Sequence, residues 1–363
     1  MHLLNRYLIT IALLFASLLT IQAQDKPKQE PKEEILRLDT NLVSIDINVT
    51  SKTGAKSPAN LKAEDFVIFE DGVRQKIENF ATMDVPFNIV LLIDTSGSAK
   101  EEIDLMKKAA KRFLNEMRAQ DRIAVIEFNQ RITVLEELTS DRDKIEQAID
   151  FLQPGTGTAF YGALQIALEE VLKKVDGRKA IIALTDGVDS TGAETYEEIL
   201  LELEKSRVTS YFLELNTEAV TEKGMLMDCN EEKSFHFSTK QLKKYLHEYA
   251  EGADETQYQD HCDLSRLERM QINRRLYESA RKELRELAAQ SGGRVYPCKR
   301  LSEIEPAYTQ IAAELRTQYS LGYYPTNEKR DGKWRKISVK VNPPRGLPRL
   351  NVRSKEGYYA VPQ

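Results

Sequence analysis

The sequence predicts an α/β protein whose doubly wound, mostly parallel sheet is inserted in, or flanked by, a β-sandwich-like domain built from N- and C-terminal strands. Apolar runs at residues 89–93, 123–126 and 180–184 alternate with segments of helical periodicity. Strands that are apolar on both faces are typical of a parallel sheet covered by helices. Before residue 86 and after residue 318 the pattern changes to short strands with turn signals. This order favours one β domain interrupted by the α/β domain, with two separate β modules as the alternative.

The first residues are typical of an export signal. Within residues 1–23, the first seven residues contain Arg6 and no acidic residue. An apolar stretch follows, and the segment ends at Ala23. The apolar stretch is shorter than the roughly 20 residues that a spanning helix needs, so we expect a cleaved signal peptide, with an uncleaved anchor as the alternative. Residues 24–34 are rich in Lys, Glu, Pro and Gln and predict a flexible tether. The protein is therefore expected to be periplasmic or extracellular, without a transmembrane segment after signal removal.

The N-terminal β segment is expected over residues 35–85. Val43, Ile45, Ile47 and Val49 alternate with polar residues, which predicts a half-buried strand. Asp71-Gly72 lies between two apolar runs and is a hairpin signal. A C-terminal β segment, residues 319–363, has three further candidate strands and is expected to pair with residues 35–85.

The α/β domain is expected over residues 86–318. Residues 219–262 are polar, lose the strand–helix rhythm, and predict an insertion with some helix. One long helix, or two in sequence, should follow over residues 264–290. The last helix is expected over residues 302–318, with Ser302 and Glu305 as a capping box.

Composition excludes several classes of function. The chain has 363 residues, 41% hydrophobic and 30% charged, and a net charge of −5. These values fit neither a disordered chain nor a multi-span membrane protein, and they do not favour non-specific nucleic-acid binding. Only four histidines are present, so His-dependent catalysis is not expected. Of the three cysteines, Cys229 and Cys262 lie in one region and are candidates to pair, leaving Cys298; other pairings stay open.

Oxygen-bearing side chains follow the ends of two predicted strands. Asp94-Thr95-Ser96-Gly97-Ser98 ends the first, and Asp186 follows the strand at residues 180–184. Ligand sites in open α/β sheets lie at the carboxyl ends of strands, and Thr158 opens a nearby helix. Such hard oxygen ligands suit Mg²⁺, with Mn²⁺ and Ca²⁺ as alternatives. Two carboxylates with several hydroxyls leave residual positive charge, which suits an acidic group of a partner.

Other interpretations of the same residues are weaker. Asp94, Ser96 and Ser98 alone would also fit a helix cap. Gly155-Thr156-Gly157-Thr158 lacks the Gly-Lys-Ser/Thr ending of a phosphate-binding loop. The serines lack a nearby histidine base. The spacings of Cys229, His236, His261 and Cys262 fit no compact zinc pattern, so we expect a disulfide or unrelated surface residues there.

The five positions resemble the metal-ion-dependent adhesion site of von Willebrand factor A domains, which has the pattern D-x-S-x-S followed by a distant Thr and a distant Asp. The resemblance covers roughly residues 86–318. The flanking Glu70-Asp71-Gly72, Tyr319-Ser320-Leu321-Gly322-Tyr323 and Gly357-Tyr358-Tyr359-Ala360 resemble a family of exported bacterial proteins, common in acidobacteria, that carry such a domain.

The resemblance implies a role for each matched residue. Ser96 and Ser98 should ligate the metal through their hydroxyls, and Thr158 should ligate it when the site is open to a partner. Asp94 and Asp186 should lie in or just behind the first layer of ligands. The favoured hypothesis is an exported, non-enzymatic adhesion or scaffold module that captures an Asp or Glu of a protein partner. The alternatives are a cell-envelope enzyme with a catalytic metal and a structural protein with a stabilising metal.

Overall fold

A computed structural model describes residues 42–51, 61–81, 85–97, 103–231, 234–250, 252–253, 255–342 and 350–360. The predicted signal peptide (1–23), the predicted tether (24–34) and Ser98 lie outside the described residues. Within the described part, no helix combines the length and the apolar character needed to span a bilayer.

The α/β domain is built on a six-stranded sheet, which confirms the predicted fold class. Its order is β10 (Arg294–Cys298), β9 (Val208–Leu215), β8 (Arg178–Thr185), β5 (Phe87–Asp94), β6 (Arg122–Phe128) and β7 (Ile132–Thr139). The first five strands are parallel, and β7 pairs antiparallel with β6. The residues of β5, β6 and β8 are almost entirely buried, as expected for strands covered on both faces.

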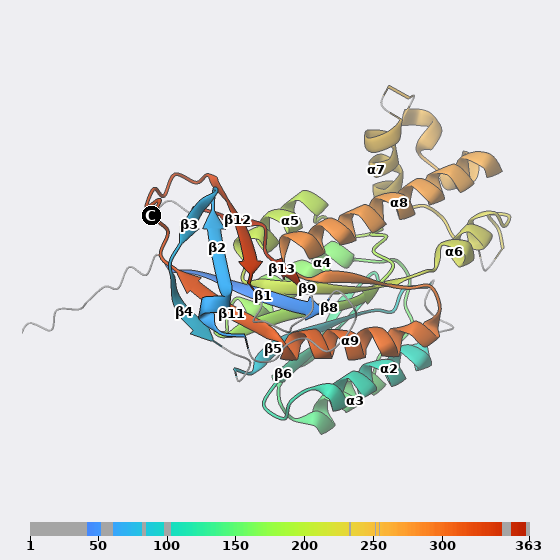
Figure 1. Ribbon diagram of the computed structural model, residues 1–363. Coiled ribbons are helices and arrows are strands. Elements are labelled where there is room, and N and C mark those ends of the chain that lie inside the picture. The colour runs from blue at the N-terminus through green and yellow to red at the C-terminus, as the bar shows by residue number, and fades with distance from the viewer. Residues whose placement is uncertain are drawn as a thin grey trace, which may run out of the picture. The chain divides into compact units, whose positions relative to one another are not determined.

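Helices cover both faces of this sheet (Figure 1). On one face lie α2 (Ile103–Glu116), α3 (Arg142–Asp150) and α9 (Ile304–Arg316); on the other lie α4 (Phe160–Gln165), its π-helical continuation η3 (Ile166–Leu172), α5 (Tyr196–Lys205) and α8 (Arg266–Gln290). Alternate residues of β5 serve the two layers: Ile89, Leu91 and Ile93 face the first, and Val90 and Leu92 the second. The sheet is therefore held by two separate apolar cores.

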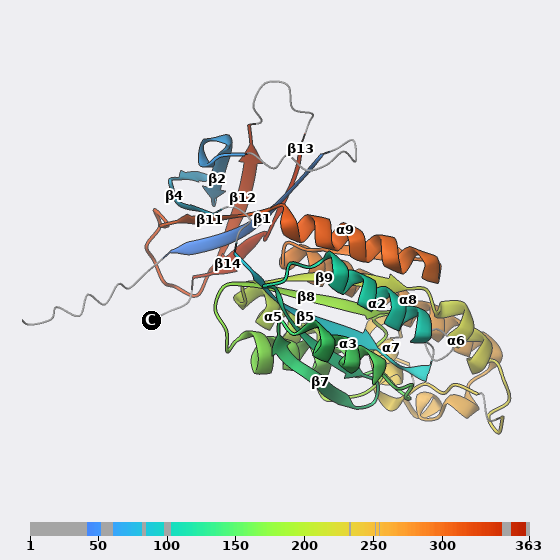
Figure 2. The same cartoon turned by 90° about the horizontal axis from the view of Figure 1, so that it is seen from below.

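The remaining strands form two four-stranded antiparallel sheets (Figure 2). One has the order β13 (Leu350–Ser354), β1 (Val43–Ser51), β11 (Gln318–Tyr323), β4 (Ile77–Ala81); the other has β14 (Gly357–Tyr359), β12 (Trp334–Val341), β2 (Phe66–Glu70), β3 (Val73–Gln75), with the short η1 (Ala63–Asp65) before β2. Strands that precede the α/β domain in the sequence pair directly with a strand that follows it, because β1 and β4 both flank β11. Ile47, Ile68, Tyr319 and Leu321 are fully buried in the shared core.

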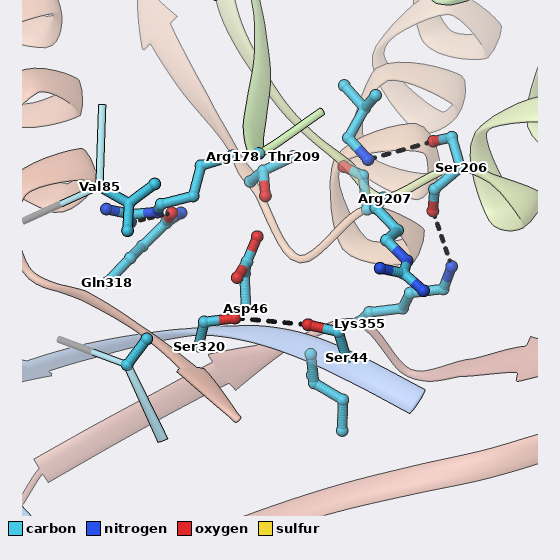
Figure 3. A pocket seen from close by; sticks show the side chains of 15 residues that line it. Ser44, Asp46, Val85, Arg178, Ser206, Arg207, Thr209, Gln318, Ser320 and Lys355 are labelled. Atoms are coloured by element: carbon cyan, nitrogen blue, oxygen red, sulfur yellow. Dashed lines mark hydrogen bonds between the residues drawn. The ribbon is translucent and has the colours of Figure 1, made fainter. Parts of the chain in front are cut away.

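The two sets of strands meet at a polar joint. Asn48 Nδ2 donates to the Tyr211 hydroxyl and to the Gly292 carbonyl, each at 3.2 Å. Beside it lies a cavity of about 270 Å³. Figure 3 shows the Asp46 carboxylate in its centre, with Arg178 on one side and Arg207 and Lys355 on the other. Burial raises the pKa of Asp46, and the nearby Arg178 opposes that rise.

The described residues between positions 218 and 263 form a small helical region beside α8. It contains α6 (Glu218–Met225), α7 (Thr239–Tyr249), η4 (Glu255–Tyr258) and η5 (His261–Asp263). Met225, Phe237 and Leu242 pack on Ile272 and Leu276 of α8 in their own apolar cluster. Cys229 and Cys262 form a disulfide, and Cys298 is buried and reduced.

The end of the α/β domain differs from one expectation. Residues Leu301–Glu303 form a 3-10 turn, η6, and α9 begins only at Ile304. Its N-cap residue is Glu303, which makes no side-chain cap hydrogen bond. The capping box predicted from Ser302 and Glu305 was therefore wrong, because Glu303 bonds instead to the Lys299 N–H and to Arg300 in the preceding turn.

Candidate metal centre

Two buried aspartates come together at the carboxyl edge of the six-stranded sheet. Asp94 is the last residue of β5, and Asp186 directly follows β8. The two strands are parallel neighbours in register, with Ile93 opposite Leu184. Asp94 is 1% exposed and Asp186 5%. The sequence therefore places both carboxylates at one point although they are far apart in the chain.

The Asp94 carboxylate is held from two sides. Its Oδ1 accepts the Ser96 N–H at 3.0 Å, and its Oδ2 accepts the Thr185 hydroxyl at 2.7 Å. Burial raises the pKa of Asp94 well above its ordinary value, and the nearby Asp186 carboxylate raises it further. Asp94 forms no ion pair with any described residue. It is a buried acid next to another acid, a pair that a cation would stabilise.

Asp186 is positioned by hydroxyl groups. Its Oδ1 accepts the Val188 N–H at 3.0 Å. Its Oδ2 accepts the Thr217 hydroxyl and, at 3.2 Å, the Tyr277 hydroxyl. The Tyr277 oxygen also lies 2.8 Å from the hydroxyls of Thr217 and Thr221. Sequence reasoning did not identify Thr185, Thr217 or Tyr277; only Thr185, which directly precedes Asp186, carried a local signal.

The loop that carries Thr158 is tied to the end of β5. The Gly155 N–H donates to the Thr95 carbonyl at 2.7 Å. Asn129 Nδ2 donates to the Thr95 hydroxyl at 3.0 Å, and the Thr158 N–H donates to the Ser190 hydroxyl at 2.8 Å. Ser96 and Thr158 are both buried, at 3% and 7% exposed. These bonds fix the two predicted hydroxyl ligands on the same edge as the aspartates.

Asp189, which follows Asp186 closely, is used differently. Its Oδ1 accepts the Tyr161 N–H at 3.1 Å, and its carboxylate pairs with Lys240 Nζ at 2.5 Å. Burial raises the pKa of Asp189 to about 6, against the influence of Lys240. Its charge is thus compensated by Lys240 of α7, and Asp189 is not among the predicted ligands.

The donor set fits a divalent cation. Asp94, Ser96, Thr158 and Asp186 supply carboxylate and hydroxyl oxygens, the ligands that hard cations prefer. The mutual repulsion of the two buried carboxylates is the observation that favours a cation here. Fixed hydrogen bonds behind both aspartates are the supporting layer that orients metal ligands. The fifth predicted position, Ser98, lies outside the described residues, and all five residues stay predicted ligands.

The chain is similar to known proteins over part of its length. Residues 89–188 match the family described as von Willebrand factor type A domain. The Synechocystis protein sll0103 is 32% identical over 112 residues, which are 30% of this chain and 27% of that protein. Escherichia coli YfbK is 31% identical over 126 residues, which are 33% of this chain and 22% of that protein. The chain thus spans about a quarter of the length of these relatives.

A solved structure of a von Willebrand factor type A protein from Catenulispora acidiphila is also similar. It is 12% identical to this chain, covers 88% of it and 73% of its own length, and has a TM-score of 0.43.

Proposed function

The chain contains a von Willebrand factor type A domain, and from this premise we propose that the protein is an exported, non-enzymatic binding module that captures an acidic group of a partner protein through a divalent cation. The observation that carries the proposal is the pair of buried carboxylates, Asp94 and Asp186, which repel each other at the sheet edge where Ser96 and Thr158 are also buried. Mg²⁺ is the proposed cation.

Each residue has a proposed part in capture. Asp94 and Asp186 hold the cation's charge, and Ser96, Ser98 and Thr158 present neutral hydroxyls. A bound Mg²⁺ would supply residual positive charge and an open coordination position for an Asp or Glu carboxylate. Thr185, Thr217 and Tyr277 keep the two carboxylates in place by donating to their oxygens. The chain therefore offers a rigid edge, and the partner completes the set of ligands.

Binding is favoured over catalysis by the groups around the carboxylates. The two carboxylates, which are the candidate general bases here, would be occupied by the proposed cation, and the hydrogen-bond donors named above are hydroxyls and backbone N–H groups. Export is supported by the pattern of residues 1–23 and by the Cys229–Cys262 disulfide, since disulfides persist in oxidising compartments.

The test separates cation binding from partner capture. Calorimetric titration with Mg²⁺ should show one site in the wild type and none in Asp186→Ala, while Asp143→Asn, which removes an exposed carboxylate on α3, should bind as the wild type does. A random peptide library is then selected on the immobilised protein in Mg²⁺. We expect the retained peptides to share an Asp or Glu and to be released by EDTA.

Two results would contradict the proposal in different ways. If Asp186→Ala binds Mg²⁺ as well as the wild type, the site is not a cation site. If Mg²⁺ binds and raises the melting temperature, but the retained peptides are the same with EDTA, the cation stabilises the fold and captures nothing.

A further inference from the structure

Three metal-ligating side chains gather in the helical region beside α8. They offer sulfur and nitrogen ligands, whereas the site of Asp94 and Asp186 offers oxygen ligands. One ligand atom each from Cys229, His236 and His261 lie within 4.8 Å of one another. The rings of His236 and His261 stack at 4.8 Å between centroids. Cys262, next to His261 in sequence, is bonded to Cys229. Two cysteines and two histidines that are up to 33 residues apart in sequence thus meet at one place.

His261 has unused binding capacity. Its side chain is 2% exposed. Its Nε2 has no hydrogen-bond partner of normal geometry among the described residues, although the Met225 backbone lies near enough to influence the imidazole, and its Nδ1 accepts a long 3.4 Å contact from the Phe237 N–H. A buried polar group without a well-formed hydrogen bond destabilises the fold. This cost is the observation, independent of the cluster, that points to a ligand.

The chemistry of the cluster differs from that of the aspartate site. Thiolate and imidazole are the ligands of zinc-class ions, with Zn–S near 2.3 Å and Zn–N near 2.0–2.1 Å, whereas Mg²⁺ prefers oxygen. Tetrahedral ligands at those bond lengths lie about 3.5 Å apart. Side-chain rotations that move these ligand atoms by about 1 Å would therefore bring them to the separations that a bound ion needs. His236 is exposed and gives an ion a path from solvent.

We propose that this cluster is a redox-gated site for a zinc-class ion. In the oxidised protein the Cys229 sulfur is bonded to Cys262, and the ion does not bind. A dithiol reductant breaks that S–S bond: its own two sulfurs join, and their protons pass to Cys229 and Cys262 as two thiols. The ion then binds Cys229, His236 and His261, with Cys262 as the fourth ligand, and each thiol releases its proton to water.

Arg269 is placed to support the reduced form. One guanidinium nitrogen, Nη2, lies 3.8 Å from Cys229 Sγ and donates to the Cys262 carbonyl at 3.2 Å. A cation beside sulfur favours the thiolate, which is the ligand. Two thiolates neutralise the charge of a divalent ion, so the filled site adds no net charge beside this buried arginine.

Cobalt is a suitable probe because it takes zinc sites and reports its ligands. The full-length protein is reduced with dithiothreitol, desalted without oxygen and titrated with Co²⁺. We expect one equivalent to produce the intense near-ultraviolet band of thiolate-to-cobalt charge transfer, which oxygen ligands do not give. The oxidised protein should show no such band. Asp186→Ala should show it undiminished after reduction, which separates this site from the aspartates.

Variants assign the ligands. Cys262→Ser releases Cys229 from the disulfide, so this variant should show the charge-transfer band without any reductant. Its affinity for Co²⁺ should be lower than that of the reduced wild type. His236→Ala changes an exposed side chain and should lower the affinity of the reduced protein for Co²⁺ at least tenfold. Circular dichroism checks the fold of each variant.

Three results would contradict the proposed site. A reduced, folded wild-type protein without the charge-transfer band overturns the proposal, whether or not Cys262→Ser folds. A band that also appears in the oxidised protein overturns the redox gate. Full affinity in His236→Ala overturns the assigned ligand set.

Discussion

Asp94 experiences opposing influences from its neighbours. Burial and the Asp186 carboxylate disfavour its charge, while the Ser96 N–H and the Thr185 hydroxyl favour it. Without a cation the buried pair costs folding energy. In the proposed site, a bound cation would offset this cost.

Asp94→Asn should stabilise the protein in EDTA by on the order of 1 kcal/mol, because it removes one of two repelling buried charges. In Mg²⁺ at 100 times the dissociation constant, the wild type should gain about 2.7 kcal/mol by mass action, and the variant should gain nothing. Urea unfolding in both buffers measures this. Equal Mg²⁺ gains in the two proteins would contradict the role given to Asp94.

Tyr277→Phe tests positioning at a residue that we do not expect to touch the ion. It removes a hydroxyl that contacts Asp186 at 3.2 Å and Thr217 at 2.8 Å. Loss of such supporting hydrogen bonds lowers metal affinity about 10- to 100-fold. We expect at least a tenfold weaker Mg²⁺ affinity by calorimetry with the circular dichroism spectrum unchanged. Unchanged affinity would show that Thr217 and the Val188 N–H suffice to hold the carboxylate.

The turn between α8 and β10 shows a sharp constraint at the scale of elements. Gly292 has a φ of +77°, and a Cβ on Gly293 would lie 1.9 Å from the Ser210 carbonyl oxygen of β9. A clash with backbone is not relieved by side-chain rotation. Only glycine lets the chain leave the long helix and pair at once with β9.

Gly293→Ala should cost more than about 3 kcal/mol of unfolding free energy, because backbone must move. Gly252→Ala is the matched control. Gly252, unlike Gly293, has a positive φ, +83°, but a Cβ there meets nothing within 4 Å, so strain alone should cost about 1 kcal/mol. Chemical unfolding of both variants decides the comparison, and similar losses would contradict the large cost that we assign to the backbone contact at Gly293.

At the scale of elements, the sequence predicted correctly those strands that are buried on both faces of the sheet. The fully apolar runs of β5, β6 and β8 are buried on both faces and were recognised as strands. β7 was not expected, because it is an edge strand with no fully buried residue, and its sequence alternates too weakly. The start of α9 was misplaced because Glu303 competes for the turn before it.

The joint between the two sets of strands concerns the whole molecule. Lys355, in the segment between β13 and β14, donates through Nζ to the carbonyls of Glu204 and, at 3.0 Å, Ser206 of the α/β domain. Burial lowers the pKa of Lys355 to about 8 from an ordinary 10.5, although Glu204 opposes the shift. The charged lysine is thus held at a cost.

The lowered pKa of Lys355 makes the unfolding free energy depend on pH. Between pH 8 and 10.5 the unfolded chain binds more protons at this position than the folded one, so its contribution to stability rises with pH. From pH 8 to 10, the unfolding free energy of the wild type should rise by on the order of 2 kcal/mol relative to Lys355→Met. Urea unfolding of both proteins at several pH values tests this, and parallel pH profiles would contradict it.

The candidate site was predictable in part for a related reason. Asp94 and Asp186 each end a recognisable strand, and parallel strands bring such ends together. Tyr277 comes from α8, 91 residues after Asp186, and no local pattern marks a helix residue that turns toward a distant loop. The approach of His236 and His261 was likewise invisible, because it depends on how α6, α7 and α8 pack.

The pairing of β1 with β11 has a mechanical consequence. The strands are antiparallel, with Val43 opposite Tyr323 and Asn48 opposite Gln318, and β11 follows directly on α9 of the α/β domain. A pull between Val43 and that domain would draw the two strands past each other lengthwise. Their cross-strand bonds would then bear the load together, in shear, instead of opening one by one. A force applied between Val43 and the α/β domain would therefore act along the direction in which this pair of strands resists separation best.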